Sequence, residues 1–312
     1  MTNLESPPPR QVIPARPADL LVFLAIAFGG AWLAAIPLWS ALPNAPGSAL
    51  QTTLAGMQLS PALGVLAVWL LRRDNARAWA RDTGLTFGGR PGRALGVTAL
   101  TWLAVPVAVA VTIAISAAAG LFPVDLAGLS GYRQVFPGAT HAFAATGLAI
   151  AIVVYPVLYA IGAFGEEWGW RGWLLPRLMP LGRTKALLLS GVIWGVWHAP
   201  LTLAGYHYPG LGWWGVPLFT AACVATGSVL GLLRLRTASV WPAVIGHAAI
   251  NGTMPALYLV ASDARHPADP VLGGVFGVVG WLVFGAIALL LARSSPGRST
   301  AGMAATRPAV RR

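Results

Sequence analysis

The sequence predicts an all-α fold, a polytopic membrane helix bundle of about eight transmembrane helices with both termini in the cytoplasm. Composition is the first reason, because 56% of the residues are hydrophobic and only 10% are charged, against roughly 25% charged in an ordinary soluble domain. The second reason is that apolar residues form runs of about 20, the length that spans a bilayer as a helix. The third is that basic residues gather in a few segments.

Eight apolar segments are long enough to span. They lie near residues 20–42, 50–71, 94–121, 147–177, 185–204, 213–233, 238–260 and 271–292. The first lacks a convincing cleavage site, so we expect it to remain as a span. The fourth is the least regular because it contains two glutamates, yet its apolar pattern resumes after them and continues to Pro176. We therefore expect one long or tilted helix, with the glutamates inside the hydrocarbon layer.

The basic residues predict the orientation in the membrane. Of 21 Lys and Arg residues, all but Arg133 and Arg265 lie in the terminal segments or near the ends of the second, fourth and sixth spans. The positive-inside rule then places both termini in the cytoplasm of a multi-pass cell-membrane protein. The net charge of +12 indicates topology and attraction to membrane lipid. It does not indicate nucleic-acid binding, because the basic residues are scattered over separate loops.

Three parts of the chain follow from this pattern. Residues 1–18 and 293–312 are rich in Pro, Ser, Ala and Arg, and we expect flexible cytoplasmic ends there. Residues 19–292 form the predicted transmembrane domain. The single cysteine, Cys223, falls within a span and excludes a disulfide inside one chain. A bias towards Ala, Gly, Arg and Pro suggests a GC-rich bacterial genome.

The most informative segment is Glu166-Glu167-Trp168-Gly169-Trp170-Arg171 in the fourth span. A charge at the bilayer centre costs about 2.5 to 3.5 kcal/mol on insertion scales, so charged residues there usually mark function. Glu167 and Arg171 are i,i+4 partners on one helical face. One arginine can neutralise one carboxylate, which leaves Glu166 as a candidate general base. A buried structural ion pair is the alternative.

Two other spans carry polar side chains at similar depth. The fifth contains His198, and the seventh contains His247 and Asn251 one turn apart on one face. Three helices that each bring polar groups to the middle of the membrane favour a site over isolated packing residues. The other histidines, His141, His207 and His266, fall in predicted external loops, and we assign them no role.

The order of these residues matches a known pattern: Glu-Glu-x-x-x-Arg, then aromatic-x-x-x-His, then His-x-x-x-Asn on membrane helices. From about Ala144 to Leu259 the chain resembles the CAAX protease and bacteriocin-processing (CPBP, or Abi) intramembrane proteases, which are relatives of the type II CAAX prenyl endopeptidases. The resemblance implies an eight-helix endopeptidase with a catalytic core at about 144–260 and a site open to the cytosol and laterally to lipid. The catalytic residues it implies are Glu166, Glu167, Arg171, His198, His247 and Asn251.

The second motif departs from the family pattern, because Trp194 stands where Phe is more frequent. We assign Trp194 to the substrate pocket. Amide hydrolysis needs an activated water, a stabiliser for the developing oxyanion and a proton for the leaving amine. We expect Glu166, helped by His198, to supply the base, and His247 and Asn251 to face the carbonyl oxygen as donors. The ion pair behind them holds the helix in place.

Metal dependence stays open at this point. Glu166, His198 and His247 could bind a divalent metal such as zinc and leave a fourth position for water. These residues come from three separate helices, however, and a His-Glu-x-x-His string is absent. A metal-free glutamate mechanism is slightly favoured.

The expected partner is a hydrophobic or lipid-modified peptide or a membrane-protein substrate, surrounded by membrane lipid. A non-catalytic bacteriocin-immunity or chaperone-like membrane protein is the alternative function. A transporter with a proton or ion site at mid-membrane ranks third, because no repeated half is evident. The natural substrate is not determined by the sequence.

Overall fold

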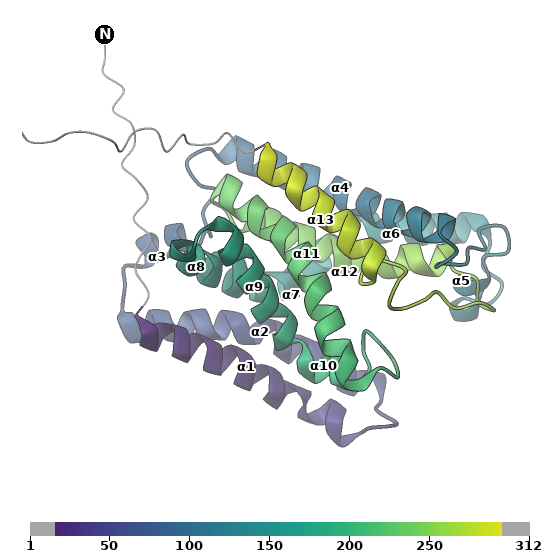
Figure 1. Cartoon of the computed structure of the whole chain (residues 1–312), viewed down its shortest axis with the longest axis horizontal. Coiled ribbons are helices and arrows are strands. Elements are labelled where there is room, and N and C mark those ends of the chain that lie inside the picture. The colour runs from purple at the N-terminus through teal and green to yellow at the C-terminus, as the bar shows by residue number, and fades with distance from the viewer. Residues whose placement is uncertain (1–15, 295–312) are drawn as a thin grey trace, which may run out of the picture.

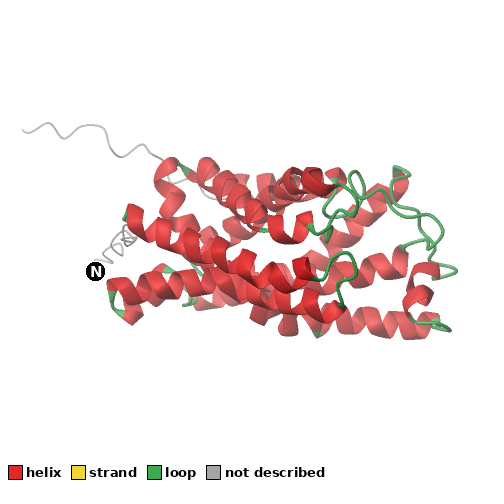
Figure 2. Cartoon of the chain, turned by 90° about the horizontal axis from the view of Figure 1, so that it is seen from below, coloured by secondary structure: helices red, strands yellow, loops and turns green. Residues whose placement is uncertain are grey.

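The chain folds into a bundle of helices that run along one long axis (Figures 1 and 2). The computed structural model describes residues 16–294, so the predicted flexible ends fall largely outside the described part. The α-helices are α1 (Pro17–Ser40), α2 (Gly47–Arg72), α3 (Ala76–Asp82), α4 (Pro91–Ala118), α5 (Ser130–Val135), α6 (His141–Val153), α7 (Tyr155–Glu167), α8 (Leu175–Leu178), α9 (Arg183–Trp197), α10 (Ala199–Leu203), α11 (Gly215–Thr237), α12 (Trp241–Ala261) and α13 (Val278–Arg293). Short π and 3₁₀ segments are η1 (Trp168–Leu174), η2 (Met179–Leu181) and η3 (Gly212–Trp214).

The predicted helical membrane bundle is confirmed. Within residues 16–294 there is no strand, and 6 helical stretches are long and apolar enough to cross a membrane. The fourth predicted span is part of a stretch of 41 residues, His141–Leu181, which agrees with the long helix expected there. The count of eight spans is not confirmed, because α9 has 15 residues and α13 has 16.

The fifth predicted span differs from a single helix. It divides into α9 and α10 at His198. Pro200 lies in the first turn of α10, and a proline cannot donate the backbone hydrogen bond that would continue α9. The break places His198 at the end of a helix, within the bundle rather than along a helix face.

Small residues let the helices approach closely. In the α1–α2 pair, a Cβ added to Gly30 would lie 2.7 Å from Ser60, and one added to Gly56 would lie 2.8 Å from Ala34. Close approach of this kind is typical of helices packed in a bilayer. The outer faces expose large apolar side chains, for example Ile161 at 76%. An apolar outer surface of this type is suited to lipid.

The two ends of the bundle differ in charge. One end, which we call the Arg-rich face, contains α3 and α8, and Arg177 pairs there with Asp82 at 2.8 Å. The opposite end, the Arg-poor face, contains α5, α10 and the loops at 119–129, 204–211 and 262–277 (Figure 1).

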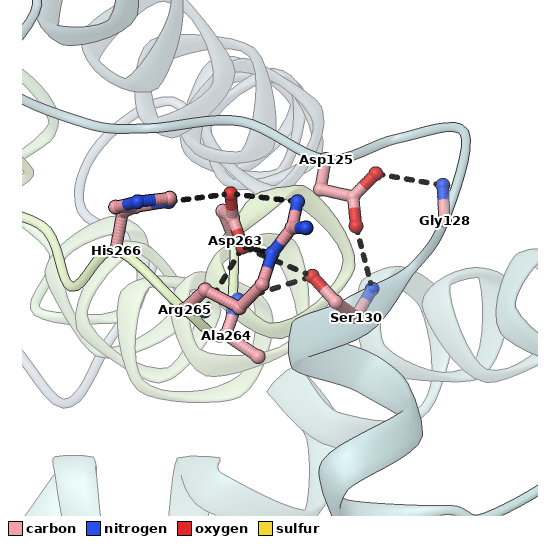
Figure 3. Close-up of polar contacts among 7 residues, drawn as sticks. All are labelled: Asp125, Gly128, Ser130, Asp263, Ala264, Arg265 and His266. Carbon is pink, nitrogen blue, oxygen red and sulfur yellow. Dashed lines mark hydrogen bonds and ion pairs between the residues drawn. The ribbon is translucent and has the colours of Figure 1, made fainter.

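Two loops of the Arg-poor face are joined by polar contacts (Figure 3). The Ser130 hydroxyl lies 3.4 Å from Asp263 Oδ1 and accepts the Ala264 backbone N–H at 3.0 Å. His266 hydrogen-bonds Asp263, and this bond, together with those from Arg265, holds the pKa of the Asp263 carboxyl well below its usual value. These contacts tie the segment after α12 to the start of α5.

Candidate active site

The paired glutamates lie where α7 passes into a π-helical turn. Glu167 ends α7, and Trp168–Leu174 form η1. Glycines at this point permit close contact with α2, since a Cβ on Gly165 would lie 2.3 Å from the Gln58 carbonyl and one on Gly169 would lie 2.4 Å from Pro61. π-helical turns are rare and frequently occur at functional sites. The sequence predicted a helix here but not its widened turn.

Glu167 is at the centre of a buried ionic network. Its Oε1 accepts hydrogen bonds from Arg171 Nη1 at 2.6 Å and from His247 Nδ1 at 2.9 Å. Glu167 and Arg171 are 0% and 1% exposed. The Arg171 guanidinium also lies over the Trp194 ring, 4.1 Å from its centroid. The expected i,i+4 ion pair is therefore present. The bond from His247 to Glu167 also links α12 to α7.

Glu166 is held by a different partner. Its Oε2 accepts a hydrogen bond from Trp194 Nε1 at 2.8 Å. This indole N–H is specific to tryptophan, so a phenylalanine at position 194 would leave the carboxylate without this donor. Trp194 thus has a second contribution besides lining the pocket to which the sequence assigned it.

The two histidines flank the Trp194 ring. The ring centroids of His198 and His247 lie 5.5 Å and 5.4 Å from that of Trp194. His198 Nδ1 lies 2.9 Å from the Trp194 carbonyl oxygen. A carbonyl can only accept, so Nδ1 carries the proton and Nε2 of neutral His198 has a free lone pair.

A cavity of about 460 Å³ connects these groups. Glu166, Trp194, His198, His247 and Asn251 all line it. The Glu167–Arg171 pair lies behind this wall, in contact with it through His247 and Trp194. Within the described residues, Asn251 makes no hydrogen bond to another side chain or to backbone, which leaves its amide available to a bound molecule. The structure thus brings all seven sequence-predicted residues together.

His207 is a further lining residue that the sequence analysis left as a surface histidine of a loop. Its ring stacks on Phe219 with centroids 3.6 Å apart and planes at 17°, and it lies 6.0 Å from the His198 ring. Burial lowers the pKa of His207 well below its usual value, so the imidazole is neutral at pH 7. No sequence signal shows that its loop turns back over the cavity. His141 begins α6 and does not lie in the loop expected for it, whereas His266 does lie in a loop. Both rings hydrogen-bond groups of loops outside the cavity.

The positions of the donor atoms bear on metal binding. Within residues 16–294, no three His, Cys, Asp or Glu side chains come together in a way that could hold a metal ion. The Nδ1 atoms of His198 and His247 and one oxygen of Glu166 are already engaged in hydrogen bonds. Among the described residues, the Nε2 atoms of both histidines and the second oxygen of Glu166 have no hydrogen-bond partner, and these are the atoms of the set that remain for another ligand.

Comparison with known proteins identifies the segment that contains the site. Residues 145–253 match the family model described as Type II CAAX prenyl endopeptidase Rce1-like. No curated protein matches the chain. The matched segment agrees with the region of resemblance found in the sequence and includes all three motifs. This match over residues 145–253 supports the CAAX protease family for the part of the chain that contains the site.

Proposed function

We propose that this protein is an intramembrane endopeptidase that hydrolyses a peptide bond with a water molecule activated by Glu166 and His198. The observation that supports the proposal most directly is the arrangement at the cavity. One glutamate faces the cavity, while its neighbour Glu167 is neutralised behind it by Arg171 and His247. The family match implies protease activity in general. A carboxylate that faces the cavity and is not held in an ion pair can accept the proton of a water molecule, as a general base must.

The base acts through two adjacent acceptors. The free oxygen of Glu166 and the unprotonated Nε2 of His198 both border the cavity. A water between them would lose its proton to Glu166 as it attacks the carbonyl carbon. The protonated carboxyl would then return that proton to the leaving amine, which keeps the proton balance of hydrolysis.

The oxyanion would be stabilised from α12. Two buried carboxylates face one arginine, so a second positive charge is needed, and a protonated His247 provides it. Its Nδ1–H donates to Glu167, and its Nε2–H is then directed at the cavity. Asn251, one turn along α12, supplies a second donor. Donors placed in advance at the developing charge are a principal source of catalysis.

The substrate that we propose is a hydrophobic or lipid-modified peptide, or a membrane-protein segment. The cavity lies inside the bundle and is lined largely by apolar side chains such as Leu54, Met57 and Ile250. An apolar pocket with a few convergent polar groups is typical of a substrate site. The mechanism proposed here needs no metal.

The test compares the membrane proteomes of cells that produce wild-type protein or Glu166→Gln, which keeps the shape of the side chain and removes the base. We expect cleavage fragments with wild type only, and equal amounts of folded protein in both. Asp269→Asn is the matched control, because it makes the same change in a loop outside the cavity. The same fragments from Glu166→Gln would refute the assigned base. If Glu166→Gln protected cells against a bacteriocin as well as wild type does, the result would favour the non-catalytic immunity protein.

Metal dependence is tested on the same fragments. We expect purified protein to keep its activity after exposure to a strong chelator, with no stoichiometric zinc. Loss of activity on chelation that zinc restores would contradict the metal-free mechanism.

A further inference from the structure

One polar side chain of the cavity wall comes from α2, a helix that carries none of the three motifs. Leu54, Met57 and Gln58 of α2 line the cavity, and Gln58 is the polar member of this group. Gln58 also lies outside residues 145–253, the segment that matches the family model. Within residues 16–294 its half-buried carboxamide makes no hydrogen bond to another side chain or to backbone. The amide is therefore available to a bound molecule.

The Gln58 amide lies against a glycine of α7. A Cβ added at Gly162 would lie 2.6 Å from Gln58 Cδ and 2.9 Å from its Nε2, and closer still to its Oε1. The absence of a side chain at Gly162 is thus what admits the amide at this place. Gly165, less than one turn further along α7, meets the backbone carbonyl of Gln58 in the same way. These two glycines position both the backbone and the side chain of Gln58 relative to α7.

This position is one helical turn from the proposed base. Gly162 and Glu166 are four residues apart in α7, so they share one face of the helix and lie about 6 Å apart along its axis. An extended peptide advances about 3.3 Å per residue. The Gln58 amide is thus placed to meet a main-chain group one or two residues away from a peptide bond held at Glu166.

The chemistry of the amide fits a peptide main chain. A carboxamide carries N–H donors and an acceptor oxygen in one plane, and a peptide group offers the complementary N–H and carbonyl. Both groups are neutral, so neither adds a charge beside Glu166. Main-chain groups that leave water for an apolar site are costly unless they are hydrogen-bonded. The side chains of Leu54 and Met57 cannot make such bonds, whereas Gln58 can.

We propose that Gln58 is a substrate-binding residue whose amide exchanges hydrogen bonds with the main chain of an extended peptide, one or two residues from the scissile bond. This inference rests on the proposed peptidase function. A main-chain contact holds the peptide at a fixed distance from Glu166 whatever side chains it carries. A helical substrate segment must then unwind locally before it is cleaved, because the main-chain groups of a helix are already paired.

The first test compares Gln58→Met with Gln51→Met in the membrane-proteome assay. Methionine keeps the length of the side chain and removes the amide donor and acceptor. Gln51 lies two turns earlier in α2, is exposed and does not line the cavity, so it is the matched control. We expect about tenfold less cleavage with Gln58→Met and wild-type cleavage with Gln51→Met, at equal amounts of folded protein. Equal cleavage by both variants would overturn the proposal.

Gly162→Ala displaces the amide without changing Gln58 itself. Alanine favours a helix more than glycine does, so we expect a thermal midpoint in detergent at least as high as that of wild type. We expect cleavage to fall about tenfold nevertheless, because the new methyl group occupies the place of the amide. On a Gln58→Ala background, Gly162→Ala should lower the rate no further. Additive losses would contradict the placement of the amide from which the proposal is argued.

Ester analogues separate a main-chain contact from an effect on Glu166. The probe is a synthetic peptide that spans a cleavage site found in wild-type membranes, with analogues in which one peptide bond within two residues of the scissile bond is an ester, which lacks the N–H donor. We expect kcat/KM of wild type to be about fivefold lower for one of these analogues than for the parent peptide, and Gln58→Met not to distinguish the two. If Gln58→Met lowers kcat/KM by the same factor for the parent and for every analogue, Gln58 acts on the water or on Glu166, and the proposal is refuted.

The outcomes keep the two proposals apart. An absence of fragments with wild type would refute the peptidase function, and with it the substrate contact that rests on it. Fragments formed equally by wild type and Gln58→Met would refute the contact alone and leave the peptidase function standing.

Discussion

Gly227 of α11 gives a sharp test of the ionic network behind the cavity. A Cβ added at this position would lie 2.6 Å from Arg171 Nη2 and 3.4 Å from Trp194 Cε3. Ordinary van der Waals contact begins at 3.4 Å, so Gly227→Ala forces the guanidinium to move by about 0.8 Å. Arg171 is buried, paired with Glu167 and stacked on Trp194, so the shift disturbs all three residues.

The magnitude follows from the buried ion pair. Complete loss of one partner of such a pair costs about 3–5 kcal/mol, and a displacement that weakens the pair costs about a third to a half of that. Gly→Ala in a helix gains about 1 kcal/mol of intrinsic propensity, which offsets part of the cost. We therefore expect a lower midpoint of thermal unfolding in detergent. A loss of about 1–2.5 kcal/mol in transition-state stabilisation corresponds to cleavage about five- to seventyfold slower, because 1.36 kcal/mol in the barrier is a factor of ten in rate.

The assay compares Gly227→Ala with Gly29→Ala. Gly29 also lies within a helix, but nothing is within 4 Å of an added Cβ there, so the control reports the propensity effect alone. Equal thermal midpoints and equal cleavage rates for Gly227→Ala and Gly29→Ala would contradict the prediction. They would show that the position of Arg171 between Glu167 and Trp194 does not support the site.

Three further changes test other parts of the structure. Trp194→Phe keeps the ring over Arg171 and removes the donor to Glu166; a hydrogen bond to a charged group contributes about 1.5–3 kcal/mol, so we expect a rate about ten- to a hundredfold lower in the cleavage assay. Tyr208 is fully buried in the loop before α11 and donates a hydrogen bond to the Phe276 carbonyl at 2.6 Å. Tyr208→Phe removes this bond, and we expect about 1 kcal/mol less stability on denaturation. Asp263→Asn removes a carboxylate with a lowered pKa, and we expect a lower midpoint of thermal unfolding at pH 7.

Each of these has its own control or contrary outcome. For Trp194→Phe the control is Trp197→Phe, which removes a donor to the Ala27 carbonyl and affects stability more than rate. For Tyr208→Phe, unfolding at the same denaturant concentration as wild type would show that the bond to the Phe276 carbonyl does not stabilise this loop. The Asp263 carboxylate contributes its full stabilisation of the fold at neutral pH, because its pKa is lowered in the folded protein. This stabilisation is lost as the pH falls below 3.8 towards the lowered pKa. A difference between Asp263→Asn and wild type that persists at the lowest pH would contradict this assignment.

The sequence alone determined the class of the protein and the identity of the polar groups. Hydropathy and the placement of basic residues are properties of short segments, so they predict helices and faces without a tertiary model. The pairing of Glu167 with Arg171 was also predictable, because residues four apart meet on one helix. The three motifs were recognisable by their order along the chain.

Only the tertiary structure decided how these groups face one another. The Trp194 bond to Glu166 and the His247 bond to Glu167 join residues that are 28 and 80 positions apart, and such pairs depend on the packing of whole helices. The π-helical turn, the break at His198 and the return of His207 over the cavity depend likewise on close contacts between segments far apart in sequence.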